Sequence, residues 1–144
     1  MAGDQADLRS PTERSALLLQ GVHILDVVLG PAGFVFGETS HGNSFGGSFA
    51  AGQFVRGDQA LSLSFRHSLG EVGYRWGHKR LSHAEYLRAL NVKGAYPGFG
   101  QQPLDGFRHL LVDLHGPLVG FVVGDRTGFD RAANEVGGSR RRLP

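Results

Sequence analysis

The chain has 144 residues, with 15 basic and 13 acidic side chains, a formal net charge of +2, 23 glycines and no cysteine. This length is enough for one domain with a buried core, and the lack of cysteine excludes disulfides, thiolate catalysis and cysteine-based zinc sites. The positive excess lies in residues 126–144, which hold five arginines and two acids, so the rest of the chain gives no charge argument for binding nucleic acid.

The limits of the domain are predicted from where the sequence loses its pattern. Residues 1–9 are polar and acidic, unlike a signal peptide, and are expected to be frayed. Residues 10–125 are predicted to form a single domain, and residues 126–144 a basic, disordered tail without apolar periodicity. Because no apolar run approaches the roughly 20 residues of a membrane span, we expect a soluble, cytoplasmic protein with no membrane partner.

The first predicted element is a helix that begins after Ser10. Ser10 and Glu13 have the spacing of a capping box, and Pro11 suits the first helical position. Apolar residues then recur at helical spacing: Leu18, Val22, Leu25 and Leu29. A Gly-Pro pair at 30–31 is expected to end this helix, whose wide apolar face must cover another element.

A glycine-rich segment, residues 37–47, follows a short strand that is expected to begin at Phe34. Its outline resembles a phosphate-binding loop, but Ser48 stands where the lysine should be and no helix pattern follows. The segment also contains GNSFG, which fits the GxSxG pattern of hydrolases but lacks the strand before it and the helix after it. We therefore interpret it as a mobile connection and predict no catalytic residue there.

A β-hairpin over residues 59–76 forms the centre of the predicted sheet, because apolar and polar residues alternate along both of its arms. Closing the hairpin through residues 68–71 places Phe65 opposite Tyr74 on the buried face. A slip of one residue would bury arginines, so we predict that the register is well specified.

The strand before this hairpin, residues 48–56, is expected to join it through a tight turn at residues 57–58. With a two-residue turn, Phe54 lies opposite Leu61 on the buried face. Small residues opposite large ones would then leave room for the first helix to approach the sheet.

Helical signals dominate the remainder of the predicted domain. Ser82 and Glu85 form a second capping box, and Pro103 can open a third helix. Residues 118–123 are interpreted as an edge strand or a packed tail. The complete prediction is an α+β fold in which a four-stranded antiparallel meander carries an N-terminal helix and two C-terminal helices.

The outward face of the predicted sheet is the candidate binding surface. The predicted register makes Arg66 and Arg75 diagonal neighbours, and like charges side by side disfavour a sheet. Further outward residues surround them: Phe49, Gln53, Val55, Ser62 and Ser64. Because arginine and aromatic residues are enriched at binding hot spots, we expect this face to bind an acidic protein surface. The alternative interpretation is a face that is merely solvated.

Histidines provide the enzymatic alternative. His67, His78 and His83 come from the hairpin and the turn after it, and could gather near one end of the sheet. A small hydrolase or metal-binding enzyme using these three residues is therefore the second hypothesis. The chain has neither HExxH nor a clustered acidic partner, so we predict no metal ligand, no catalytic residue and no cofactor.

Several short sequences between about residues 17 and 125 carry a resemblance to a known family. They are LxxxxGPAGFxF, FVRGD, LSHAEYLRAL, YPGF and PLDGFRHLLVDL. These resemble a family of short, uncharacterised bacterial proteins, and their order is loosely similar to that of toxin-immunity-like proteins. The resemblance implies a non-catalytic, protein-binding role, and it carries no catalytic residue over to this chain.

Overall fold

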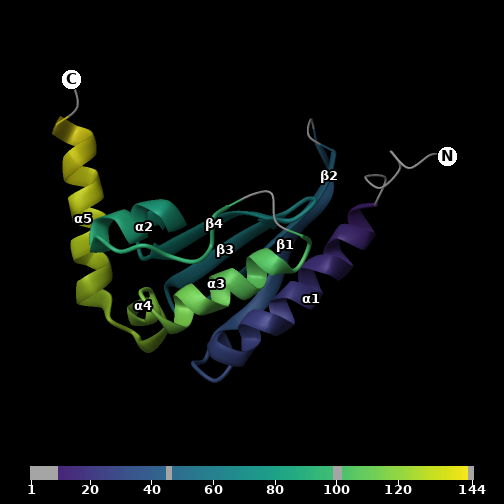
Figure 1. The fold of residues 1–144 in the computed structure, drawn as a ribbon, viewed down its shortest axis with the longest axis horizontal. Helices are drawn as coiled ribbons and strands as arrows, with labels where there is room; N and C mark the ends of the chain where they lie inside the picture. The colour runs from purple at the N-terminus through teal and green to yellow at the C-terminus, as the bar shows by residue number, and fades with distance from the viewer. Residues whose placement is uncertain (1–9, 45–46, 99–101, 143–144) are drawn as a thin grey trace.

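The computed structural model describes residues 10–44, 47–98 and 102–142, so the expectation that residues 1–9 are frayed lies outside the described part. Its elements are α1 (Pro11–Leu29), β1 (Val35–Ser44), β2 (Gly47–Arg56), β3 (Gln59–Phe65), β4 (Leu69–Trp76), β5 (Lys79–Ser82), α2 (His83–Leu90), α3 (Asp105–His115), α4 (Val119–Val123) and α5 (Arg126–Arg142). The predicted α+β fold with an antiparallel sheet is confirmed, but the described sheet has five strands rather than four. Figure 1 shows α1 and α3 lying side by side across one face of this sheet.

The strands follow one another as an antiparallel meander in the order β1-β2-β3-β4-β5. Most of the glycine-rich segment belongs to β1, which pairs with β2 along its length, so its interpretation as a connection is wrong for residues 37–44. Backbone pairing with β2 holds this edge strand, and the Phe36 ring packs against the Phe54 ring with 5.2 Å between centroids. The GNSFG sequence runs through residues 45–46, which lie outside the described part, and leads into a strand rather than a helix.

The pairing of β2 with β3 follows the predicted register. The predicted register between β3 and β4 is wrong, because Tyr74 lies opposite Leu61 instead of Phe65. β4 begins at Leu69, which is opposite Phe65 beyond a bulge, and the pairing is shifted by four residues. Since four is an even number, the same side chains still face inward, and Phe65 and Trp76 are buried as predicted.

The inner face of the sheet is covered by α1 and α3. Ser10 caps α1 as predicted: its hydroxyl accepts from the Glu13 N–H (3.2 Å), and the Glu13 carboxylate accepts from the Ser10 N–H (2.7 Å). Ser82 caps α2 in the same way. The predicted apolar stripe of α1 is buried: Leu18, Val22, Leu25 and Leu29. Gly21 lies against the ring of Phe107, so any side chain there would keep α1 away from α3.

The C-terminal part of the chain differs from the prediction. Residues 119–123 form the short helix α4 rather than an edge strand, and α5 occupies most of the segment expected to be a disordered tail. Phe129 is fully buried, and its ring contacts those of Trp76, Tyr86 and Phe121. A narrow apolar stripe at spacings of three and four, hidden among charged residues, docks this helix on α2 and β5.

Candidate functional site

The outer face of the sheet, opposite α1 and α3, carries a concavity of about 740 Å³. Polar side chains from four strands line it: Gln53, Ser62, Ser64, Glu71, Arg75 and Arg80. Residues 96–98 and the start of α2 add to the lining beside β4. The space bounded by these residues is termed the outer groove.

Within the outer groove, a row of small and polar residues crosses four strands. The register aligns them as Gln53, Ser62, Gly73 and Ser82. Neighbouring strands lie about 4.8 Å apart, so the row is roughly 14 Å long. Gly73 has open space where a side chain would begin, which keeps the floor low. The groove is therefore long enough for an extended polypeptide segment.

Two arginines stand side by side along the groove. Arg75 of β4 and Arg80 of β5 are direct cross-strand partners, which places their β-carbons about 5 Å apart. Among the described residues, the Arg75 guanidinium donates only to the carbonyls of Asp58 (3.3 Å) and Gly77 (3.5 Å), and both hydrogen bonds are long. Arg80 is exposed and has neither a hydrogen bond nor an ion pair with the described residues. Directly opposed like charges destabilise a sheet, so this pair does not help the fold.

Other polar groups of the outer groove also have unused hydrogen-bonding capacity. Within the described ranges, the Gln53 amide and the Ser62 hydroxyl form no hydrogen bond, whereas Ser64 accepts one from the Glu71 N–H at 3.2 Å. Glu71 precedes Arg75 by four residues on β4, which separates their α-carbons by roughly 13 Å. The groove thus presents donors and acceptors that solvent or a ligand must satisfy.

Four of the seven predicted binding residues line the outer groove: Gln53, Ser62, Ser64 and Arg75. Sequence reasoning misses Arg80, because the stretch after the central hairpin is predicted to be a turn, whereas Lys79–Ser82 forms a fifth strand. The signal that could have found it is the alternation of buried Leu81 with exposed Arg80 and Ser82.

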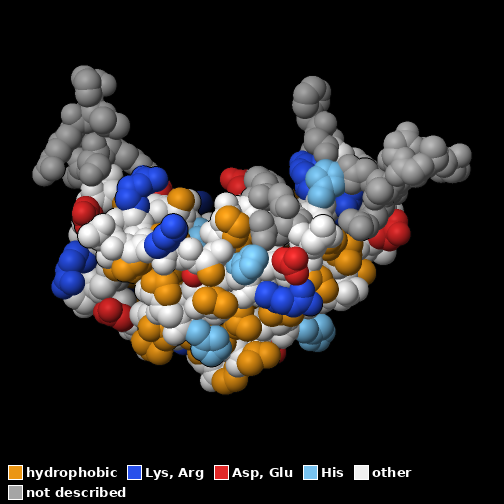
Figure 2. All heavy atoms as spheres, in the orientation of Figure 1, with side chains coloured by type: hydrophobic (Ala, Val, Ile, Leu, Met, Phe, Trp, Pro, Cys, Tyr) orange, Lys and Arg blue, Asp and Glu red, His pale blue; other side chains and the backbone are white. Residues whose placement is uncertain are grey.

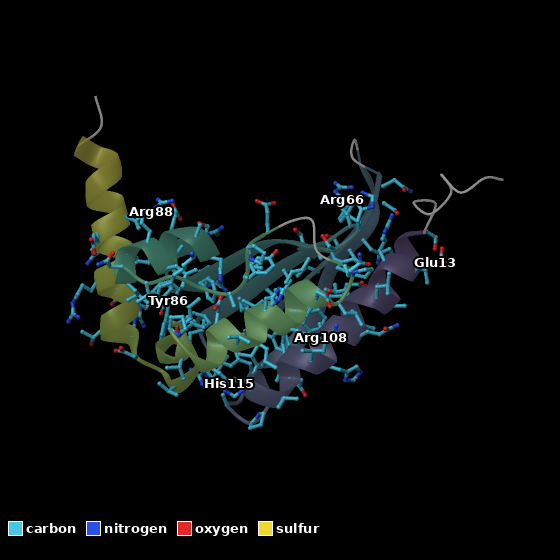
Figure 3. All side chains as sticks on the ribbon, viewed as in Figure 1. Glu13, Arg66, Tyr86, Arg88, Arg108 and His115 are labelled. Carbon is cyan, nitrogen blue, oxygen red and sulfur yellow. The ribbon has the colours of Figure 1, made fainter. Side chains whose placement is uncertain are left out.

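Arg66 does not lie beside Arg75, and the expected arginine pair is wrong because of the register shift between β3 and β4. Arg66 lies at the end of the sheet where α1 begins, as Figure 3 shows. It donates to the Gly47 carbonyl at 2.7 Å and lies over the Phe49 ring, 5.5 Å from its centroid. Val55 is half-buried on β2 and does not line the outer groove.

A network of buried, hydrogen-bonded polar side chains lies on the inner side of β4. The Tyr74 hydroxyl is 2.8 Å from His83 Nδ1, and His83 Nε2 is 2.9 Å from Asp113 Oδ2. The Asp113 carboxyl group also accepts from the backbone N–H groups of Ala95 (2.6 Å) and Tyr96 (3.0 Å). The Tyr96 hydroxyl donates to two carbonyls at the start of β4. This hydrogen-bond network therefore links β4, α2, α3 and the segment before α3.

Burial sets the protonation states of the side chains in this hydrogen-bond network. It lowers the pKa of His83 from 6.5, and the hydrogen bond to Asp113 opposes that shift only in part. Burial, followed by the nearby Asp113 charge, raises the pKa of Tyr74 well above its usual value, and burial raises the pKa of Tyr96 to about 12. At neutral pH, Tyr74 therefore donates to His83 Nδ1, and His83 Nε2–H donates to Asp113. Since His83 is only 6% exposed, we interpret this hydrogen-bond network as a structural brace.

The three histidines of the enzymatic hypothesis do not converge. His67 lies in the turn before β4 and His78 in the turn after it, so the eight residues of β4, about 26 Å, separate the two turns. Consecutive hairpin turns lie at opposite ends of a sheet, which the expectation of a shared end overlooked. His83 is buried with Tyr74 and Asp113. No group of three His, Asp or Glu residues suited to a metal ion occurs in the described part of the chain.

A second surface lies on the opposite side of the molecule. Figure 2 shows apolar side chains gathering over α1, α3 and α4, with histidines among them. Its exposed apolar residues include Leu19, Val27 and Val112. Apolar groups of this kind give little indication of which partner they would select, whereas the outer groove has directional polar groups.

No protein-family model, curated protein or solved structure matches this chain. None of the described helices is long and apolar enough to cross a membrane. The functional proposal therefore rests on the geometry of the outer groove.

Proposed function

We propose that this protein is a non-catalytic binding protein whose outer groove holds a segment of a partner protein. The observation that carries the proposal is the unused hydrogen-bonding capacity of Gln53, Ser62 and Arg80 within a concavity of about 740 Å³. Ligand sites typically have volumes of roughly 300–1,000 Å³ and use a few convergent polar groups for specificity.

An immunity-like role, in which the protein blocks a partner in a bacterial cytoplasm, is part of this proposal and rests on the sequence resemblance. Such a role needs a recognition surface and no reactive group. The contacting surface of the partner is proposed to be acidic, because Arg75 and Arg80 both line the groove. The proposal involves no nucleic acid, membrane or cofactor.

The alternative is a small hydrolase or metal-binding enzyme that uses His67, His78 and His83, and it has less support. The first two residues lie at opposite ends of β4, and the third is buried. His83 and Asp113 resemble part of a catalytic triad, but burial raises the pKa of Tyr74, the third member, which makes its hydroxyl a poor nucleophile at neutral pH.

Site-specific photo-crosslinking tests the proposed function. Ser62, which is exposed on the groove floor, is replaced by p-benzoylphenylalanine in the full chain within the source organism. The matched control carries the same replacement at His115, which is exposed on α3 at the other side of the molecule (Figure 3). We expect a defined partner to be trapped from position 62 and not from position 115.

The trapped partner is then purified, and its affinity is measured by calorimetry. Ser62→Trp should weaken binding about tenfold or more, because the indole fills the floor of the groove, whereas His115→Trp should leave the affinity unchanged. Equal trapping from both positions, or full affinity in Ser62→Trp, would refute the assignment of the groove as the binding site.

A further inference from the structure

We infer that the occupant of the outer groove is an extended, acidic segment of a partner protein, and that Arg75 and Arg80 together bind one of its carboxylates. This inference rests on the proposed function and adds the chemistry of the ligand. It replaces the predicted Arg66–Arg75 pair with the pair that the register brings together.

The case for a carboxylate comes from the two guanidinium groups. They extend from directly opposed positions on β4 and β5, and both line the same groove. Among the described residues, Arg75 donates only two long hydrogen bonds, and Arg80 has no polar partner. A carboxylate between them would accept several charge-assisted hydrogen bonds and cancel the repulsion between the like charges.

The case for an extended segment comes from the floor of the groove. The row of small and polar residues runs roughly 14 Å across four strands, about the length of four extended residues. Gln53 and Ser62 are cross-strand partners in this row, and both have free polar atoms within the described ranges that could bond to the backbone of a ligand. Leu87 and Pro97 line the groove beside β4 and offer apolar contact to a neighbouring side chain.

The charges that face the groove favour a carboxylate-bearing peptide over a nucleic acid. They are Arg75 and Arg80 on one side and Glu71 on the other, while burial lowers the pKa of His83 and keeps it neutral. A phosphate backbone needs a series of cations along its path, and Glu71 would repel it. A peptide can instead place its acidic residue between the arginines and an uncharged residue near Glu71.

The experiment follows the amide signals of the full, ¹⁵N-labelled chain by NMR during titration with defined probes. The first probe is a synthetic peptide of about eight alternating glutamate and serine residues, a length that spans the groove. The second peptide has glutamine in place of glutamate, and the third probe is a thymidine oligonucleotide of the same length. The signals of Ser62, Gly73 and Arg80 report on the groove.

We expect the glutamate peptide to shift these signals saturably, with an affinity that falls as salt is added. The glutamine peptide should bind at least about tenfold more weakly. Arg80→Gln removes no hydrogen bond with the described residues, and it should lower the affinity for the glutamate peptide about tenfold. Arg75→Gln should lower this affinity by a similar factor. Arg108→Gln, on α3 (Figure 3), is the matched control and should leave the affinity unchanged.

Three results would overturn the inference. They are equal binding of the two peptides, tighter binding of the oligonucleotide, and the absence of any groove shift with the glutamate peptide. None of them decides the proposed function, because crosslinking at position 62 tests that separately. Loss of the position-62 crosslink, in contrast, would remove the proposed function and this inference together.

Discussion

The two faces of the sheet differ in how their arginines are used. Arg56 is the last residue of β2 and represents the inner face. It donates to Gln59 Oε1 (2.9 and 2.7 Å) and to the carbonyls of Ala32 (2.7 Å) and Val122 (2.8 Å). Arg80, on the outer face, has no such bond within the described part of the chain. A buried polar group without a partner is costly, whereas an exposed one is satisfied by water until a ligand displaces it. Unused hydrogen-bonding capacity, rather than residue type, therefore distinguishes the outer face from the inner one.

The largest expected effect tests the inner half of this comparison. Asp113→Ala should lower the free energy of unfolding by about 3–5 kcal/mol, because it leaves the His83 N–H and the Tyr96 backbone N–H buried without an acceptor. Urea unfolding followed by circular dichroism measures this. The control Asp105→Ala, which breaks an exposed ion pair with Arg108, should cost under about 1 kcal/mol. A similar, small cost for both variants would mean that the brace does not stabilise the fold.

The docking of α5 is the next largest effect. Phe129→Ala should lower the free energy of unfolding by about 3 kcal/mol, because its fully buried ring packs against three other aromatic rings. The matched control is Val123→Ala, a side chain that is 71% exposed, which should change stability by less than about 0.5 kcal/mol. A negligible loss in Phe129→Ala would show that α5 contributes nothing to the core.

The pH dependence of stability should report on His83. Its folded pKa lies below 6.5, the value for the unfolded chain, so the unfolded state binds more protons as the pH falls. The contribution of His83 to stability should be complete above about pH 6.5. As the pH falls below that value, the free energy of unfolding should decrease by up to about 1.4 kcal/mol per pH unit. His83→Gln should remove this slope in urea unfolding, whereas His115→Gln should keep it. A slope that survives in His83→Gln would have to come from another group.

The same brace should also fail at high pH, for the opposite reason. The folded pKa of Tyr74 is raised, and that of Tyr96 is about 12. Their contribution is therefore complete below about pH 10, the unfolded value, and is lost as the pH rises further. Tyr96→Phe should show a smaller loss between about pH 10 and 12 than the wild-type chain.

The smallest effect sharpens the outer half of the comparison. Arg80→Glu should raise the free energy of unfolding by about 0.5 kcal/mol, because it replaces a like-charge cross-strand pair with an opposite one. Arg80→Gln should give a smaller gain, and thermal unfolding at low salt resolves the series. A loss of stability in both variants would indicate that Arg80 supports the fold, and would weaken its assignment to ligand binding.

Local signals made part of the fold predictable. The capping boxes at Ser10 and Ser82 depend on residues three positions apart, and the β2–β3 register depends on a two-residue turn. The β3–β4 register was not predictable in the same way, because alternation fixes which side chains face inward but not which residues pair. The predicted and observed pairings of Tyr74 differ by an even number, and both satisfy the pattern.

The remaining errors have a common physical cause, because tertiary contacts override weak local patterns. β1 pairs with β2 along its length although most of its residues are polar or glycine, and α5 docks through the narrow stripe around Phe129 although charged residues surround it. The candidate site was only partly predictable, since Arg80 enters it through β5, a strand of four residues.

The irregularity between Glu38 and Ser40 in β1 has a consequence for how this protein behaves at high concentration. β1 is the last strand of the described sheet, and its ten residues form an edge that could template the addition of another chain. The bulge at this point interrupts the even spacing of backbone donors and acceptors and increases the local twist. A long edge broken in this way is a poorer template for the open-ended stacking that leads to fibrils.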